Sequence, residues 1–326
     1  MGIKGFMKNM IHDKPDKKKR NYESVYIDCN YLLHYFIYNC KNDNDLYNKT
    51  YNYFRYLFGV ISMEKVYLIF DGKHPHHLQE INPKKQTCIQ RTKYKKESDD
   101  YDKKKISPNM PIITTFKTFL THSINTLKKI FKPTLITFVN DDSIDEEADF
   151  KILDDIYKSN HKNVCIVSRD SDMILIAYSL IYKKQINIDI LSKLKPIEFI
   201  DVNEIYKLYN IDYVLIILLL GNDYLPKLSN VDYDSIINNY KLYIKHQCPM
   251  IIIDGKINKN NLINYLTYII LNKKIKFNYK NIDNHRFDKY YNNILWCLKK
   301  YKVLDNEKNY IEDTNNVINI YNFIYS

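Results

Sequence analysis

Short apolar runs alternate with amphipathic stretches along the first two thirds of the chain. The runs are rich in β-branched and aromatic residues and have the length of buried strands. We expect strands at residues 22–28, 66–70, 135–139, 164–167 and 186–191. Between them, apolar residues recur at helical spacing, which predicts helices at residues 31–40, 54–63, 113–131, 145–159 and 171–178. Strands that alternate with helices predict an α/β fold, with a mainly parallel twisted sheet flanked by helices.

The remainder of the chain departs from this alternation. Residues 73–111 are rich in His, Lys and Pro without a clean period, so we expect a long connection that turns helical around residues 84–96. From about residue 203 the spacing is mostly helical, and we expect helices at residues 205–220, 235–245, 260–271 and 290–301. These changes predict two domains, residues 1–230 and a helical C-terminal extension of residues 231–326.

The distribution of charged residues indicates a candidate partner. Lys and Arg number 49 against 38 Asp and Glu, which leaves a formal net charge of +11. Basic residues gather at residues 14–20 and 84–105. Such clusters are typical of proteins that bind a polyanion such as nucleic acid, although a solvated Lys-rich surface is an equally good interpretation. Charge alone therefore does not decide between the two.

Several classes of protein are disfavoured by the sequence. No apolar run approaches the roughly 20 residues of a membrane helix, and no secretory signal is recognisable, so we expect no membrane partner. The six cysteines show no C-x-x-C spacing, which argues against a zinc site and a disulfide framework. A reducing compartment is expected, either the cytoplasm or the nucleus.

Acidic residues occur where the expected strands end or the following helices begin. They are Asp28, Asp71, Glu147, Asp149, Asp170, Asp172 and Asp223. Because the carboxyl ends of parallel strands meet at one edge of a sheet, these side chains can converge there. Carboxylates packed together repel one another, so they would be protonated, scattered by the fold or neutralised by cations. A single D-x-D pair is more often a cap or a turn, and it is the whole set that favours a site.

The donor chemistry indicates which cations such a site would take. Oxygen ligands without Cys or His select Mg²⁺ or Mn²⁺. Two such ions about 4 Å apart can stabilise the attacking and leaving oxygens of a phosphodiester displacement. The sequence therefore predicts a site for two metal ions at the strand ends.

Short motifs surround these carboxylates in a definite order. They are MGIKG (residues 1–5), VYIDCNYLLH (25–34), FDGKHP (70–75), ISP (106–108), EADFKI (147–152), DSD (170–172) and GNDYLP (221–226). In order and approximate spacing they resemble the N-terminal catalytic region of the Xrn family of 5′→3′ exoribonucleases, within the wider superfamily of PIN-like and flap nucleases. The resemblance covers about residues 1–230, and its last motif is the most specific. A composition rich in Lys, Asn, Ile and Tyr also fits a viral member of the family.

The resemblance implies an activity and a set of site residues. The enzyme would hydrolyse single-stranded RNA from an end that carries a 5′-monophosphate, and would release nucleotides. The seven carboxylates would be catalytic residues and ligands of two Mg²⁺ or Mn²⁺ ions, with Asp149 standing where the family usually has Glu. Residues 1–230 would then form the nuclease domain.

The resemblance also implies residues that bind the substrate. His34 would stack on the first base, and the terminal phosphate would bind Gln90, Arg91, Lys93 and Lys95. Tyr94 stands where the family has a second basic residue. Asn30 would orient a metal-bound water, and a helix cap is an equally good interpretation of this residue. For His34 and residues 90–95, a solvent-facing helix is the alternative.

Two other functions remain open from the sequence. Flap endonucleases share the seven carboxylates but act on DNA, and they continue into a helix-hairpin-helix with a G-x-G turn. Residues 228–233 (LSNVDY) contain no glycine, which disfavours that grip on duplex DNA. A catalytically inactive nucleic-acid-binding protein is the second alternative, although every carboxylate position still holds Asp or Glu. Single-stranded RNA is thus the expected partner, with DNA as the alternative.

Overall fold

The computed structural model describes residues 3, 6, 20–37, 40–72, 111–131, 135–137, 146–194, 197–222, 224–225, 227–228, 231–272 and 284–305. The chain divides into two compact units: Ile11–Glu204, called here the sheet unit, and Met1–Met10 with Ile205–Ser326, called here the helical unit. The functional boundary expected at residue 230 stays a prediction. No helix in these ranges is long and apolar enough to cross a membrane.

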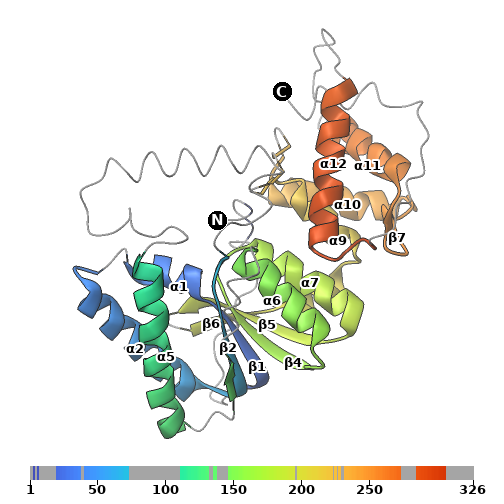
Figure 1. Ribbon diagram of the computed structural model, residues 1–326. Coiled ribbons are helices and arrows are strands. Elements are labelled where there is room, and N and C mark those ends of the chain that lie inside the picture. Colours follow the sequence, from blue (N-terminus) through green and yellow to red (C-terminus); the bar gives the residue numbers. More distant parts are fainter. Residues whose placement is uncertain are drawn as a thin grey trace. The chain divides into compact units, whose positions relative to one another are not determined.

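A six-stranded sheet of order β3-β2-β1-β4-β5-β6 forms the centre of the sheet unit (Figure 1). Its strands are β1 (Arg20–Asp28), β2 (Ile61–Ile69), β3 (Leu135–Thr137), β4 (Asn163–Val167), β5 (Asn187–Leu194) and β6 (Ile197–Asp201). Neighbouring strands from β3 to β5 pair in parallel, and only β6 runs antiparallel to its neighbour β5. The predicted α/β class with a mainly parallel sheet is therefore confirmed.

Helices cover both faces of this sheet (Figure 1). One face carries α1 (Cys29–Ile37), α2 (Asp43–Val60) and α5 (Pro111–Phe131), and the other carries α6 (Ala148–Lys158) and α7 (Asp172–Lys184). Alternation along β1 assigns side chains to the two faces. Val25 and Ile27 enter the cluster beneath α1, α2 and α5, whereas the Tyr26 hydroxyl donates to Asp155 of α6 at 2.6 Å.

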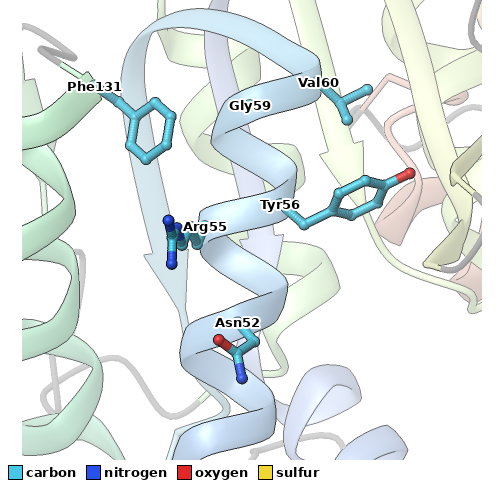
Figure 2. A pocket seen from close by; sticks show the side chains of 6 residues that line it. All are labelled: Asn52, Arg55, Tyr56, Gly59, Val60 and Phe131. Atoms are coloured by element: carbon cyan, nitrogen blue, oxygen red, sulfur yellow. The ribbon is translucent and has the colours of Figure 1, made fainter.

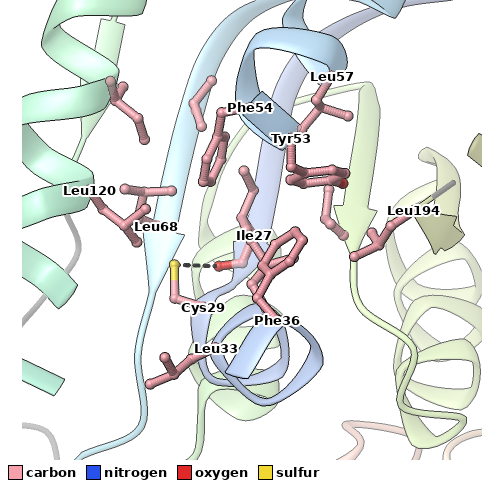
Figure 3. Close-up of a cluster of buried hydrophobic side chains, with 14 of the residues drawn as sticks. Ile27, Cys29, Leu33, Phe36, Tyr53, Phe54, Leu57, Leu68, Leu120 and Leu194 are labelled. Carbon is pink, nitrogen blue, oxygen red and sulfur yellow. Dashed lines mark hydrogen bonds between the residues drawn. The ribbon is translucent and has the colours of Figure 1, made fainter. Parts of the chain in front are cut away.

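The apolar cluster on the first face holds the ends of β1 and β2 in place (Figure 3). Ile27 at the end of β1 and Leu68 near the end of β2 are fully buried against Phe36, Phe54 and Leu120. Full burial of one such side chain contributes about 1.5–3 kcal/mol. The residues that follow Ile27 and Leu68 along the chain therefore emerge from a rigid edge.

The helical unit is built around a buried carboxylate. Its elements include α9 (Asp212–Leu218), α10 (Tyr233–Lys245), the strands β7 (Ile252–Ile253) and β8 (Lys256–Ile257), α11 (Lys259–Asn272) and α12 (Asn284–Lys300). Asp212 accepts hydrogen bonds from the Tyr240 hydroxyl at 2.6 Å and from the amides of Ile251 and Ile252 at 2.9 and 2.6 Å. Burial raises the pKa of Asp212, and these donors oppose the rise. One side chain thus joins α9, α10 and the segment that leads into β7.

Some predicted elements differ from those observed. The helix expected at residues 205–220 is two helices, α8 (Val202–Leu208) and α9, and in the turn between them the Asn210 side chain accepts the Asp212 amide at 3.0 Å. Residues 61–63, expected in a helix, belong to β2, since Ile61 pairs with Arg20 of β1. The first half of α2, β6 and the β7–β8 hairpin were not predicted. The helix expected at residues 84–96 lies outside the described residues.

Candidate metal centre

The candidate site lies at the carboxyl ends of β1, β2 and β4. In the order β3-β2-β1-β4-β5 the sheet reverses its winding between β1 and β4, and such a reversal leaves a crevice outside the strand ends. Asp28 ends β1 and pairs with Ile69 of β2, while Ile27 pairs with Val167 of β4. Asp71 and Asp170 follow β2 and β4, so parallel pairing brings three acidic positions to one edge.

Asp71 is held by Asn30 and by the start of α6. The Asn30 side-chain amide donates to Asp71 Oδ2 at 2.7 Å, and its carbonyl oxygen accepts the Asp71 backbone amide at 3.1 Å. The Ala148 amide, at the first residue of α6, donates to Asp71 Oδ1 at 2.8 Å. A nearby backbone bond from Gly72 to Glu146, 2.8 Å long, adds to this link. Asn30 therefore clamps a carboxylate 41 residues away in the sequence.

Ser168 joins Asp28 to the loop after β4. Its hydroxyl donates to Asp28 Oδ2 at 3.3 Å and accepts the Asp170 amide at 3.2 Å. The Asp172 amide in turn donates to Asp170 Oδ1 at 3.3 Å, and the Tyr31 amide donates to Asp28 Oδ1 at 2.9 Å. Sequence reasoning missed Ser168. The available signal was a polar residue placed directly after a buried strand and next to an acidic motif.

Electrostatics show that Asp28 and its acidic neighbours lie close together. Burial, together with the negative charges of Asp71 and Asp170, raises the pKa of Asp28 to about 7. The Tyr31 amide and the Ser168 hydroxyl act in the opposite direction. An ordinary Asp carboxyl has a pKa of 3.8. A cation bound at this edge would favour the ionised form and reverse the shift.

The other acidic positions lie at helix starts. Glu147 directly precedes α6, and Asp149 is in its first turn, where its side chain accepts the Phe150 amide at 2.8 Å. Asp172 begins α7 and is 5% exposed. The buried Lys151 ammonium donates to the Phe70 carbonyl at 3.1 Å, which ties α6 to the residue before Asp71.

The predicted substrate-binding residues are described only in part. His34 is on α1, four residues after Asn30, and is partly buried. Residues four apart lie on the same face of a helix, so His34 and Asn30 share one face of α1. Asp223 and the basic segment with Gln90, Arg91, Lys93 and Lys95 lie outside the described residues.

The donor chemistry at this edge fits Mg²⁺ or Mn²⁺, whereas the geometry is incomplete. Among the described residues of this cluster the charged metal-ligand atoms are carboxylate oxygens, and burial together with the negative charges of Asp71 and Asp170 raises the pKa of Asp28. Among the described residues, no three Asp, Glu, His or Cys side chains are placed to hold one ion together. The convergence of all seven carboxylates stays a prediction.

Asp28→Asn is expected to stabilise the protein at pH 8 in the absence of divalent cations. Between pH 4 and pH 7 the folded state keeps a proton that the unfolded state releases, so stability falls as pH rises through this window. Below about pH 4 the carboxyl is neutral in both states, and the variant should then match the wild type. One pKa unit is worth about 1.4 kcal/mol, so a rise from 3.8 to about 7 corresponds to a gain of roughly 4 kcal/mol at pH 8. Urea unfolding at pH 4 and pH 8 measures the difference in free energy of unfolding between variant and wild type. An equal difference at the two pH values would contradict the prediction.

Comparison with known proteins shows the fold. No protein-family model matches the chain, and no curated protein is similar to it in sequence. The catalytic core of Rad2 in complex with a DNA substrate is similar in structure, with a TM-score of 0.50, 14% identity, and coverage of 94% of this chain and 88% of that chain. Flap endonuclease-1 from Methanococcus jannaschii matches with a TM-score of 0.46 and 14% identity, over 92% of this chain and 98% of that chain. T5 5′-exonuclease with bound zinc ions matches with a TM-score of 0.44 and 14% identity, over 88% of this chain and 94% of that chain. The chain thus shares the α/β fold of the Rad2 catalytic core.

Proposed function

We propose that the protein is a metal-dependent nuclease that degrades single-stranded RNA from an end carrying a 5′-monophosphate. The observation that carries this proposal is the proximity of Asp28, Asp71 and Asp170 where the parallel sheet reverses its winding: Ser168 joins Asp28 to Asp170, and the charge of Asp71 acts on Asp28. Three close carboxylates at this edge disfavour one another unless cations share their charge. Cations bound at this edge could stabilise the attacking and leaving oxygens of phosphodiester hydrolysis.

Each described residue has a definite part in this proposal. Two Mg²⁺ or Mn²⁺ ions, when bound by the seven carboxylates, supply an activated water and stabilise charge on the phosphate oxygens. Asn30 and the Ala148 amide orient Asp71, and Ser168 orients Asp28. These hydrogen bonds are made by the protein alone. The carboxylates are thereby directed before any ion binds, which lowers the reorganisation needed for binding.

The 5′ specificity rests on the resemblance to the Xrn family. His34 would stack on the first base, and its place on the same face of α1 as Asn30 supports this role. The basic segment with Gln90, Arg91, Lys93 and Lys95 would bind the terminal phosphate. A pocket closed around that phosphate would admit a chain end and exclude an internal segment of the strand.

A structure-specific DNA nuclease is the second candidate. The shared fold favours it, because the Rad2 catalytic core was solved with a DNA substrate. The glycine-free sequence of residues 228–233 disfavours it, since a G-x-G turn is absent there. An inactive nucleic-acid-binding protein is a third candidate, and it would keep the fold and the basic clusters of the sequence without turnover.

One digestion panel separates these candidates. It compares linear 5′-phosphorylated RNA, 5′-hydroxyl RNA, circular RNA, single-stranded DNA and a flap duplex, each with Mg²⁺ and with EDTA. We expect mononucleotides from the 5′ end of phosphorylated RNA, no cleavage of circular RNA, and no cleavage in EDTA. Two charge-assisted bonds of about 1.5–3 kcal/mol each would favour the phosphorylated end by roughly 10²-fold or more. Faster internal cleavage of the flap duplex would replace this proposal by the second candidate, and absence of all cleavage would support the third.

A further inference from the structure

An exposed arginine lies inside the acidic loop of the candidate site. Arg169 is placed between Ser168 and Asp170 in the loop that joins β4 to α7. Ser168 is fully buried and is bonded to Asp28, and the Asp170 carbonyl accepts the Met173 amide at 3.2 Å. The backbone on both sides of Arg169 is therefore held by hydrogen bonds, while its side chain is exposed.

The Arg169 guanidinium does not pair with the acidic groups around it. Asp28, Asp170 and Asp172 all lie within three residues of it or are bonded to its neighbours. Within the part of the chain that the structure describes, Arg169 nevertheless takes part in no hydrogen bond and no ion pair. Its planar fork of donors is thus available to a ligand, and this fork matches the oxygens of a phosphate in a bidentate arrangement.

The loop that carries Arg169 is joined to the α1 side of the site. Ser168, the residue before Arg169, donates to Asp28, and Asp28 accepts the backbone amide of Tyr31 on α1. Tyr31 is the residue whose amide binds Asp28, and His34 follows it by three residues on α1. Arg169 therefore lies near the helix that carries the candidate base-stacking residue.

We propose that Arg169 binds a backbone phosphate of the nucleic-acid substrate, on the α1 side of the carboxylates. The inference rests on the proposed nuclease function and adds a substrate contact to it. A polyanion that approaches several carboxylates is repelled unless positive charge at the same edge compensates. Arg169 supplies such a charge from the protein itself, next to Asp170, and its bidentate geometry would fix the position of the strand.

Steady-state kinetics of variants test this contact in the full chain. With 5′-phosphorylated RNA and Mg²⁺, Arg169→Ala is expected to lower kcat/KM by roughly 10-fold to 100-fold, mainly through a higher KM, which is the loss of one charge-assisted bidentate contact. Arg169→Lys keeps the charge but loses the fork, so we expect an intermediate value. The matched control is Arg55→Ala. Arg55 is exposed on α2 and lines a surface hollow of about 380 Å³ with Phe131 (Figure 2).

An RNA substrate in which one phosphodiester linkage is uncharged identifies the phosphate that Arg169 binds. A methylphosphonate, moved one position at a time along the 5′ end of the RNA, removes the charge of single phosphates. At the position that Arg169 binds, the substitution should weaken wild-type binding and leave Arg169→Ala unaffected. Wild type and variant responding alike at every position would overturn the proposal.

Binding in EDTA separates this inference from the proposed function. The slope of log affinity against log salt, measured by anisotropy with a labelled 5′-phosphorylated RNA, should fall by about 0.7–1 in Arg169→Ala, because one phosphate contact is lost. If the wild type cleaves RNA but the variant keeps its KM and salt slope, the inference fails and the nuclease function stands. If the wild type does not cleave but the slope falls, the nuclease function fails and the phosphate contact stands.

Discussion

Asp170→Asn is expected to reduce Mg²⁺-dependent cleavage by about 10³-fold or more while the protein stays folded. A metal ion at a phosphodiester contributes several kcal/mol of charge stabilisation in the transition state, and about 4 kcal/mol corresponds to 10³ in rate. The asparagine keeps an oxygen that can accept the Asp172 amide, which Asp170 Oδ1 accepts at 3.3 Å. It also removes one of the negative charges that raise the pKa of Asp28. Loss of activity would therefore come without loss of stability.

Single-turnover cleavage of 5′-phosphorylated RNA and thermal unfolding, measured on the same preparation, check this prediction. Asp234→Asn is the matched control, because Asp234 is exposed in the first turn of α10. This control should cleave at the wild-type rate. Undiminished cleavage by Asp170→Asn would show that the loop after β4 does not bind the metal ion, and would contradict the proposed mechanism.

Asn30→Asp is expected to lower kcat by about 10-fold to 100-fold with little change in KM. Residues that orient a metal-binding carboxylate typically have effects of this size. In the wild type, the Asn30 amide nitrogen lies 2.7 Å from Asp71 Oδ2 and donates a hydrogen bond to it. The aspartate would place a second negative oxygen there, so that the clamp is lost and Asp71 is repelled. Asn30 is thus a positioning residue, acting through Asp71.

The Mg²⁺ dependence distinguishes this role from a general structural one. If Asn30 orients Asp71, the Mg²⁺ concentration for half-maximal activity should rise in Asn30→Asp, and the melting temperature in EDTA should fall only slightly. Asn52→Asp is the matched control, since Asn52 is exposed on α2 beside Arg55 (Figure 2). If Asn30→Asp has a higher KM together with a lower kcat, and its Mg²⁺ dependence is unchanged, Asn30 is assigned to substrate binding instead.

Local patterns determined the strands and the edge at which the candidate site lies. Residues 25–27, 66–69 and 164–167, in the carboxyl-terminal parts of β1, β2 and β4, are continuously apolar because parallel strands in the middle of this sheet are covered on both faces. Asp28 and Asp71 stand out in the sequence because each follows such a run. Parallel strands end at a common edge, so the sequence could predict where acidic side chains would gather.

Local patterns could not determine the elements whose partners are distant. The first half of α2, residues 43–53, is largely polar, and its stability comes from packing of Leu46 and Tyr53 in the apolar cluster and from the cap of Asn42 on Asp45. Strand β6 forms by antiparallel pairing with β5, and its five residues are too few to indicate that partner. The break between α8 and α9 lies at Asn210, whose side chain accepts the Tyr240 hydroxyl of α10 at 2.8 Å. Each of these depends on a contact that a short window of sequence does not contain.

The arrangement of the site itself was decided by the tertiary structure. Asn30 meets Asp71 across 41 residues, the Ala148 amide meets Asp71 across 77, and Ser168 meets Asp28 across 140. A hydrogen bond depends on distance and direction within a few tenths of an ångström, and only the packing of strands and helices sets these. The exposure of Arg169 beside buried Ser168 has the same origin, because the turn after β4 directs one side chain inward and the next outward. The sequence specified which groups can act, and the strand order β2-β1-β4 decided which of them meet.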